Sequence, residues 1–343
     1  MVNSLRILGC YSGSGGYNRY PSSQLLIINN KSYLIDCGEG TQFLLKKYKT
    51  KLSSIDNIFI SHLHGDHYFG LPGLISYFNL KGRTKDLKIY APKGLKKIIT
   101  LMMKSGKSWT SYNLIFNELE HKSVQIIDND EILVQTLKLN HRIPSTGFLF
   151  KSKKNLDISY AYCSDTSYNP TITSLIEGVN ILYHESTFLS KHQDLADKTK
   201  HSTALEAGEI ALKARVSQLI LGHFSSRYKN LDEFRIEASS LFSNTFIATA
   251  LSTALVWTGI NGTMMLKKNR NVLILLIGAC YSFLLFVKMA FVLFARRHLM
   301  VWAIFAPKYI FTATIVIVID VAFLLCMMCL SSGGERDEGK KKM

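Results

Sequence analysis

The chain contains little cysteine and lacks the features that mark many secreted proteins. Its six cysteines follow no spacing that indicates a disulfide framework. Cys326 and Cys329 lie in an apolar run without other metal ligands, which favours packing over zinc binding. A reducing compartment therefore fits best. The first six residues lead into a short strand-like stretch without a long apolar run, so we expect no secretory signal.

Acidic residues are also scarce, since 25 Asp and Glu face 41 Lys and Arg in 343 residues. Residues 1–245 hold 30 basic and 21 acidic side chains in ordinary globular sequence, whereas residues 246–343 hold 11 and 4 in mostly apolar sequence. The first part is long enough to bury an α/β core. Its lysine surplus favours a polyanionic partner such as nucleic acid, although surface lysines often serve solubility alone.

The densest cluster of chemically active side chains follows the apolar residues 58–60. It contains His62, His64, Asp66 and His67, which are three imidazoles and a carboxylate within six residues. On a tight turn the first two histidines can face one metal ion while Asp66 and His67 face a second, as in two-metal hydrolases. The alternative is a solvated polar loop, but other parts of the chain supply the ligands that this motif lacks.

Three more polar side chains lie just past apolar, strand-like stretches. They are His141, Asp165 and His223. One such residue would mean little, but three of them beside the histidine motif complete two sets of four zinc ligands if Asp165 bridges the ions.

Strands alternate with helices along residues 1–245. Helices are expected at 42–48, 70–79 and 94–103, and strands at 5–8, 25–29, 33–36, 57–61, 87–90, 124–127, 133–139, 146–150, 158–163 and 218–222. The pattern predicts an α/β sandwich of two mixed sheets covered by helices, with ligands on loops at one sheet edge. Asp36 ends one strand, where it is either a turn cap or a carboxylate that orients a metal-bound histidine.

Further motifs accompany the metal ligands. They are residues 36–42, His141 with Pro144 and residues 147–148, and residues 164–166, 184–187, 201–203 and 223–228. With the histidine motif at 62–67, the set resembles the ribonuclease Z family, the tRNA 3′-processing endonucleases of the metallo-β-lactamase superfamily. The resemblance covers residues 1–245 and implies the metallo-β-lactamase αββα sandwich.

The resemblance also implies a ligand set for two Zn²⁺ ions. One ion would be bound by His62, His64, His141 and Asp165, and the other by Asp66, His67, Asp165 and His223. Asp66 would in addition be the general base.

Other site residues are implied in the same way. His201, oriented by Glu185, would protonate the leaving ribose oxygen, and Ser225 and Arg227 would contact the substrate. His184 belongs to one of these motifs, but it could equally be a histidine packed in the core. The expected reaction removes the 3′ trailer from precursor tRNA and leaves a 3′-hydroxyl, and a homodimer is a further implication.

The chain departs from the family pattern in two places. Only 23 residues separate His141 from Asp165, where bacterial members usually carry a longer insertion with a protruding arm that grips tRNA. After residue 245, the expected last strand is replaced by residues 246–250 and then membrane-like sequence. A chain without the arm could still hydrolyse phosphodiesters although it binds tRNA poorly. A phosphodiesterase with another substrate is therefore the alternative.

The C-terminal part contains two long apolar runs. Residues 272–295 carry one charge, Lys288, and residues 309–330 carry one, Asp320. Each run exceeds the roughly 20 residues needed to span a bilayer, so we expect a transmembrane hairpin at 272–330, a linker at 246–271 and a charged tail at 331–343. A pair of buried core helices is the alternative.

The basic residues that flank this hairpin predict its orientation. More of them lie on its outer ends than in its connecting loop, which favours both ends, and the catalytic domain, in the cytoplasm. The loop at 295–308 resembles the C-terminal segment of GPI ethanolamine phosphate transferase 3, but none of that enzyme's catalytic domain is present, so its activity is not implied. A membrane fragment of this kind with an inert N-terminal domain is a third interpretation.

Overall fold

The computed structural model describes residues 3–13, 19–249, 253–255 and 265–267. The strands are β1 (Ser4–Gly9), β2 (Ser23–Ile28), β3 (Lys31–Cys37), β4 (Ile55–Phe59), β5 (Leu87–Pro92), β6 (Leu114–Leu119), β7 (Gln125–Asp128), β8 (Ile132–Leu139), β9 (Ser145–Ser152), β10 (Ser159–Cys163), β11 (Ile181–Glu185), β12 (Gln218–Gly222), β13 (Thr245–Ile247), β14 (Thr253–Leu255) and β15 (Met265–Lys267). The α-helices are α1 (Thr41–Lys47), α2 (Gly65–Tyr68), α3 (Leu71–Leu80), α4 (Leu95–Ser105), α5 (Gln193–Thr199), α6 (Ala204–Lys213) and α7 (Asp232–Ser239).

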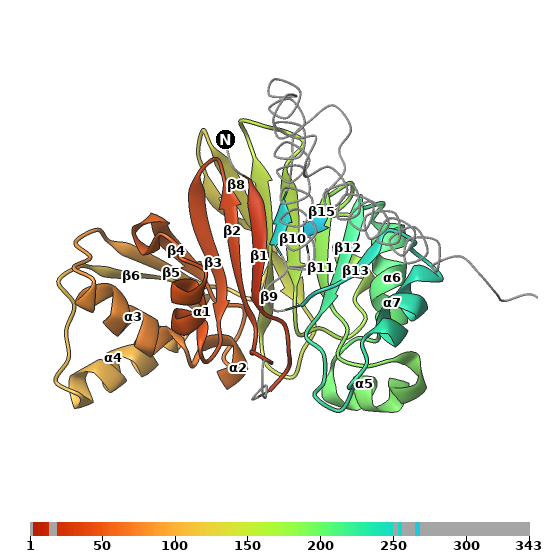
Figure 1. The fold of residues 1–343 in the computed structure, drawn as a ribbon, viewed down its shortest axis with the longest axis horizontal. Coiled ribbons are helices and arrows are strands. Elements are labelled where there is room, and N and C mark those ends of the chain that lie inside the picture. The colour runs from red at the N-terminus through yellow and green to blue at the C-terminus, as the bar shows by residue number, and fades with distance from the viewer. Residues whose placement is uncertain (1–2, 14–18, 250–252, 256–264, 268–343) are drawn as a thin grey trace, which may run out of the picture. The chain divides into compact units, whose positions relative to one another are not determined.

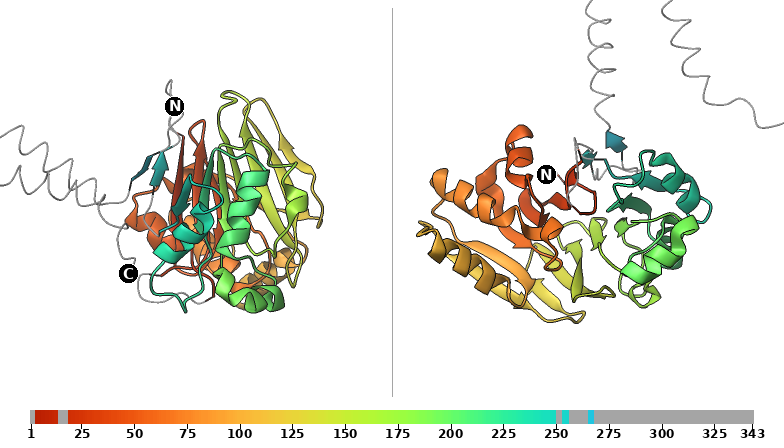
Figure 2. Two further views of the ribbon diagram at one scale, coloured as in Figure 1. Left: turned by 90° about the vertical axis from the view of Figure 1, so that its right-hand side faces the viewer. Right: turned by 90° about the horizontal axis from the view of Figure 1, so that it is seen from below.

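The strands form two mixed sheets. The first has the order β15-β14-β1-β2-β3-β4-β5-β6, and the second has the order β13-β12-β11-β10-β9-β8-β7. Helices α1, α3 and α4 lie beside the first sheet, and α6 and α7 lie beside the second (Figures 1 and 2). The predicted α/β sandwich of two mixed sheets is therefore confirmed.

Alternation along the strands of the first sheet separates two hydrophobic cores, because successive side chains point to opposite faces. On β3, Tyr33 and Ile35 belong to the core that the two sheets share. Leu34, between them, belongs to the core under α1, α3 and α4. On β4, Phe59 and Ile58 divide in the same way. Both faces of this sheet are thus buried, which leaves its strand ends as the place for polar chemistry.

Parallel pairing brings those strand ends together. β3, β4, β5 and β6 run parallel in the first sheet, and β10, β11, β12 and β13 run parallel in the second. The carboxyl ends of parallel neighbours meet at one edge, where open α/β sheets place their ligands. The loop after β4 and the loops after β10, β11 and β12 carry most of the predicted site residues.

The expected loss of the domain's last strand after residue 245 is not seen, because β13 pairs with β12. Within the predicted linker at 246–271, β14 also pairs with β1. The strand β6 at the far edge of the first sheet is also missing from the prediction, because its partly exposed residues show no clear apolar alternation.

Among the residues that the structure describes, no helix has the length and apolar character needed to cross a membrane. The predicted hairpin at 272–330 and the charged tail at 331–343 lie outside the described residues.

Candidate metal centre and active site

Loops from both sheets meet at the site, and the backbone there is strained. Asp36, Asp165 and His223 have φ values of 54°, 60° and 58°, in the left-handed region that residues other than glycine rarely adopt. Each lies at or just past the end of a strand. Such conformations cost about 1–3 kcal/mol each and gather where the surrounding structure enforces a function.

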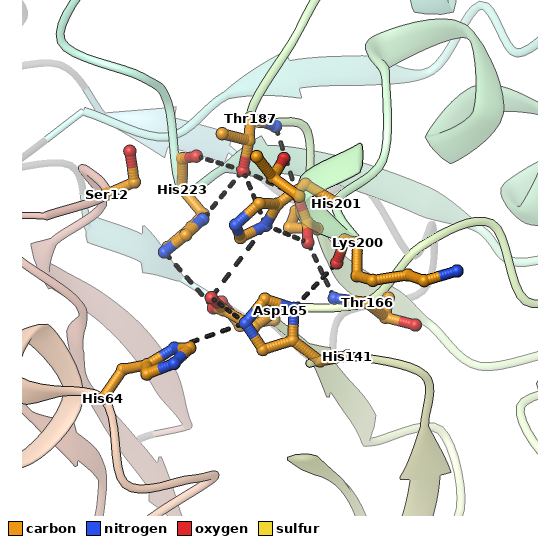
Figure 3. A network of polar contacts seen from close by, with 12 residues as sticks. Ser12, His64, His141, Asp165, Thr166, Thr187, Lys200, His201 and His223 are labelled. Atoms are coloured by element: carbon orange, nitrogen blue, oxygen red, sulfur yellow. Dashed lines mark hydrogen bonds and ion pairs between the residues drawn. The ribbon is translucent and has the colours of Figure 1, made fainter. Parts of the chain in front are cut away.

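The first predicted ligand set lies close together. The Nδ1 atom of His64 is 2.9 Å from His62 Nε2 and 3.3 Å from His141 Nε2. The Oδ1 atom of Asp165 lies 3.6 Å from His62 Nε2 and 3.7 Å from His141 Nε2. Figure 3 shows His64, His141 and Asp165 facing one another. These four side chains could hold one metal ion.

The second set forms around the other oxygen of the same aspartate. Asp165 Oδ2 lies 3.1 Å from His67 Nε2 and 3.2 Å from His223 Nε2. Asp66 Oδ2 lies 3.6 Å and 3.5 Å from the same two nitrogens. Asp66, His67 and His223 could hold a second ion. Asp165 thus turns one carboxylate oxygen to each set, as a bridging ligand would.

Two buried nitrogen atoms show that the second set fits a metal. The Nε2 atoms of His67 and His223 are buried and make no hydrogen bond. Their Nδ1 atoms are already engaged, 2.7 Å from Asp36 Oδ2 and 2.9 Å from Thr187 Oγ1. Metal-bound histidines use one nitrogen for the metal and the other for an orienting hydrogen bond. The two free nitrogens therefore fit metal coordination.

The first set shows the same division of its ring nitrogens. His141 Nδ1 lies 2.7 Å from the backbone oxygen of Lys200, and His62 Nδ1 lies 3.0 Å from Ser61 Oγ. Both rings therefore turn Nε2 toward the site. The carboxylate of Asp165 is almost fully buried, and no lysine or arginine pairs with it among the described residues. A buried carboxylate without such a partner fits a metal cation.

Asp36 orients one of these histidines, which decides between the two interpretations open from the sequence. Its fully buried carboxylate accepts hydrogen bonds from Ser61 N (2.8 Å), Ser61 Oγ (2.9 Å) and Tyr162 Oη (2.7 Å) in addition to its contact with His67. These partners come from the metal loop and from the second sheet. Asp36 therefore fixes the ring of His67 and ties the two sheets together below the site.

Glu185 holds His201 at the side of the metal centre. Glu185 Oε1 lies 2.8 Å from His201 Nδ1, and the Glu185 carboxylate also accepts from Thr166 N and Thr187 Oγ1. Burial opposes protonation of His201, but the Glu185 carboxylate outweighs it and raises the pKa of His201 to about 9. The imidazole is then a cation at neutral pH, as a proton donor must be.

His201 could also join Asp165 and His223 around a metal ion. However, its Nδ1 atom is 2.8 Å from Glu185 and 4.0 Å from Asp165 Oδ1. The Nδ1 atom of His201 is therefore engaged with Glu185 rather than with Asp165.

Asp66 remains ionised at the site. Burial alone would raise the pKa of its carboxyl, but His67 and His223 outweigh burial and lower it well below the usual range. The backbone amide of Gly13 donates to Asp66 Oδ2 over 2.8 Å. A carboxylate that is ionised at neutral pH can bind a metal cation.

Sequence and structural comparisons agree with this geometry. A family model described as "Anti-Pycsar protein Apyc1" matches residues 4–233. Ribonuclease Z of Bacteroides thetaiotaomicron is 38% identical over 291 residues, covering 71% of this chain and 92% of that protein. Ribonuclease Z of Cytophaga hutchinsonii is 39% identical over 292 residues, and the match covers 71% of this chain and 93% of that protein. The chain belongs to the ribonuclease Z family.

Solved structures place this ribonuclease Z homologue in the metallo-β-lactamase fold. The crystal structure of human tRNase Z, short form, has a TM-score of 0.64 and 28% identity, and the match covers 73% of this chain and 98% of that one. The metallo-β-lactamase fold protein YhfI of Bacillus subtilis has a TM-score of 0.63 at 23% identity, and the match covers 76% of this chain and 100% of that one. The predicted resemblance of residues 295–308 to a GPI ethanolamine phosphate transferase receives no support from these comparisons.

The chain is shorter than its ribonuclease Z relatives within the matched region. The 291 aligned positions of the Bacteroides protein span only 71% of 343 residues, so that protein carries several tens of residues that this chain does not. Between His141 and Asp165, β9 and β10 are joined by a short turn in which Ser152 N donates to Ile158 O over 2.9 Å. No arm protrudes there, as the short spacing in the sequence predicted.

The predicted substrate residues of this family member lie on the loop after β12. Arg227 Nε donates to Ser225 Oγ over 3.2 Å, and its guanidinium carbon lies 5.2 Å from the Phe188 ring centre. No sequence motif pointed to Arg19, which donates to the backbone oxygens of Ser226 (3.0 Å) and Tyr228 (3.3 Å) and so holds this loop in place.

His184 takes the packing role that the sequence left open. It is fully buried, and its Nδ1 atom lies 2.7 Å from the backbone oxygen of Glu185. It belongs to none of the groups of described residues that could hold a metal ion. Thr187, by contrast, was not predicted as a site residue, although its hydroxyl lies between Glu185, His201 and His223.

Proposed function

We propose that this protein is a zinc-dependent endoribonuclease that removes the 3′ trailer of precursor tRNA and leaves a 3′-hydroxyl. Membership of the ribonuclease Z family gives the reaction class. The observation that carries the zinc assignment is Asp165, whose two oxygens face two separate histidine sets. Imidazole and carboxylate donors in this number suit Zn²⁺.

Bound by the two sets, two Zn²⁺ ions would supply the Lewis acidity that two-metal phosphodiesterases use. Side chains of the protein would accept and donate the protons. Asp66, ionised before the reaction, would accept a proton from the attacking water. His201, which Glu185 keeps protonated, gives a proton to the 3′ oxygen of the leaving ribose. The trailer then carries the 5′-phosphate.

Ser225 and Arg227 would position the substrate phosphate. Both lie on the loop that begins at the ligand His223, and both are at least partly exposed. A guanidinium can bind two phosphate oxygens at once, and packing against Phe188 limits the conformations that Arg227 can adopt.

A phosphodiesterase with another substrate is the second candidate. It is favoured by the missing arm between β9 and β10 and by the matching family model, which is described as an anti-Pycsar protein. The third interpretation, an inert N-terminal domain, is opposed by the complete ligand set.

A cleavage assay distinguishes the first two candidates. The purified full chain, loaded with zinc, would be given a precursor tRNA and bis(p-nitrophenyl) phosphate in parallel, and the RNA ends would be mapped. A single cut at the start of the trailer with a 3′-hydroxyl supports the proposal. Hydrolysis of the small diester without cleavage of the precursor rejects it in favour of the alternative.

Assembly and location remain proposals of their own. A homodimer follows from the family resemblance. Anchoring by a hairpin at 272–330, with the catalytic domain facing the cytoplasm, follows from the apolar runs and the flanking basic residues. Protease protection on sealed membranes tests this topology, because residues 1–245 should be digested without detergent.

A further inference from the structure

One stretch beside the catalytic loop combines uncompensated positive charge with exposed apolar side chains. Residues 93–112, which include α4, contain five lysines and no acidic residue: Lys93, Lys96, Lys97, Lys104 and Lys107. None of the five forms an ion pair with another described residue. Lysines elsewhere in the domain often have such partners, for example Lys154 with Glu131 and Lys191 with Glu233. The stretch therefore presents its charge to solvent.

The same stretch exposes three large apolar side chains. Leu101 is 64% exposed, Met102 52% and Trp109 76%. On α4, Lys97, Leu101 and Lys104 follow a spacing of four and three residues and so share one helix face. The opposite face is buried through Leu95 and Ile99. We call Lys97, Leu101, Lys104, Lys107 and Trp109 the α4 patch.

Trp109 is held in this position by the chain around it. Ser108 N donates to the backbone oxygen of Met103 over 2.9 Å, which ties the turn to the end of α4. Ser111 N donates to Asn79 Oδ1 over 2.8 Å, which ties the following residues to α3. These bonds fix the backbone on either side of Trp109, so the backbone that carries the indole loses little conformational entropy when a partner covers it.

The helix that carries the α4 patch starts beside the catalytic loop. α4 begins next to the metal-binding loop, since a Cβ atom on Gly94 would come within 3.7 Å of the Leu63 side chain, between the ligands His62 and His64. From there the helix extends by about 16 Å. Figure 1 shows α4 and α2 at the same lower side of the domain.

We propose that the α4 patch binds the stem of the RNA substrate and replaces the grip that the missing arm supplies in longer relatives. This rests on the proposed function. The lysines match the phosphates of an RNA stem, and Trp109 offers a face for base or ribose stacking. A lipid surface is the less suitable partner, because contact at this position would bring the membrane against the approach to the metal centre.

Charge-reversal variants with a matched control test the patch. K104E/K107E reverses two charges inside the α4 patch. K51E/K151E makes the same change in net charge at two exposed lysines outside the α4 patch. Binding of a labelled precursor tRNA to the full chain would be measured by fluorescence anisotropy without zinc, over a range of salt concentrations. Hydrolysis of bis(p-nitrophenyl) phosphate would be measured with zinc.

The proposal expects K104E/K107E to weaken precursor binding about tenfold at low salt and to reduce the slope of log Kd against log salt by about one to two. W109A should weaken binding about fivefold with the slope unchanged. The Kd of K51E/K151E for the precursor should be close to that of the wild type. All variants should hydrolyse the small diester at the wild-type rate. Equal Kd values for K104E/K107E and K51E/K151E would overturn the proposal. So would reduced cosedimentation of K104E/K107E with phosphatidylserine vesicles at unchanged RNA affinity.

The two proposals fail in different ways. If the wild type hydrolyses the small diester but never cleaves the precursor, the proposed function is wrong. The anisotropy measurement still decides whether the α4 patch binds an RNA stem.

Discussion

The Asp36 carboxylate lies 2.7 Å from Nδ1 of His67, and the opposite nitrogen of that ring faces the metal centre. Orienting carboxylates of this kind usually contribute 10–100-fold to metal affinity. We therefore expect Asp36→Asn to weaken the second zinc site by about that factor, measured by competition with a zinc chelator. Tyr162→Phe, which removes one donor to Asp36 and leaves His67 in contact with it, should have a smaller effect. Equal affinities in the wild type and Asp36→Asn would contradict the orienting role.

Asp66→Ala should abolish hydrolysis and reduce bound zinc from two ions to one, because it removes a ligand and the proton acceptor together. Elemental analysis of the dialysed protein and the diester assay give the two readings. Asp232→Ala, at an exposed position on α7, is the matched control. Two zinc ions with activity retained in Asp66→Ala would reject both roles.

If His201 donates a proton and binds no metal, as proposed, His201→Ala should slow precursor cleavage by about 10²- to 10⁴-fold with two zinc ions still bound. His121→Ala removes a histidine outside the site, whose ring lies 3.0 Å from the Leu139 backbone oxygen, and should behave as the wild type. Loss of one zinc ion in His201→Ala would move this residue into the ligand set.

The pH profile gives an independent test of the Glu185 and His201 pair. A proton donor is active below its pKa, so kcat should fall as the pH rises through about 9. Glu185→Gln removes the carboxylate that raises this pKa, so the fall should begin at lower pH, closer to the ordinary histidine value of about 6.5. An alkaline limb that does not move in Glu185→Gln would show that another group controls it.

Those parts of the site that lie close together in the chain, or belong to a recognisable motif, could be predicted from the sequence. His62, His64, Asp66 and His67 fall within six residues, so their spacing alone indicates a shared metal-binding role. Asp165 could be predicted as a bridge only by completing the ligand count. The structure supports that prediction by turning its two oxygens to different histidine sets.

Contacts between distant segments could not be predicted. The hydrogen bond from Tyr162 to Asp36 joins residues 126 positions apart in the sequence, and that from Arg19 to Ser226 joins residues 207 positions apart. Local sequence patterns cannot reveal pairs at such separations. The left-handed backbone at Asp165 and His223 is likewise imposed by tertiary structure against their intrinsic preference. The pairing of β14 with β1, beyond the predicted boundary at residue 245, could not be predicted for the same reason, because the two strands lie far apart in the sequence.

That boundary gives the last prediction. A chain ending at residue 271 keeps β13, β14 and β15, whereas one ending at residue 244 exposes the edge of β1 and loses Ala248, which is fully buried and accepts from Cys10 Sγ. An unpaired strand edge and lost burial both destabilise a sheet. We expect the shorter chain to unfold about 5–10 °C lower, since each kcal/mol is worth about 2–4 °C in a domain of this size. Thermal unfolding followed by circular dichroism, with and without zinc, provides the measurement. Equal midpoints would mean that the domain ends where its composition changes, and that β13 and β14 add no stability.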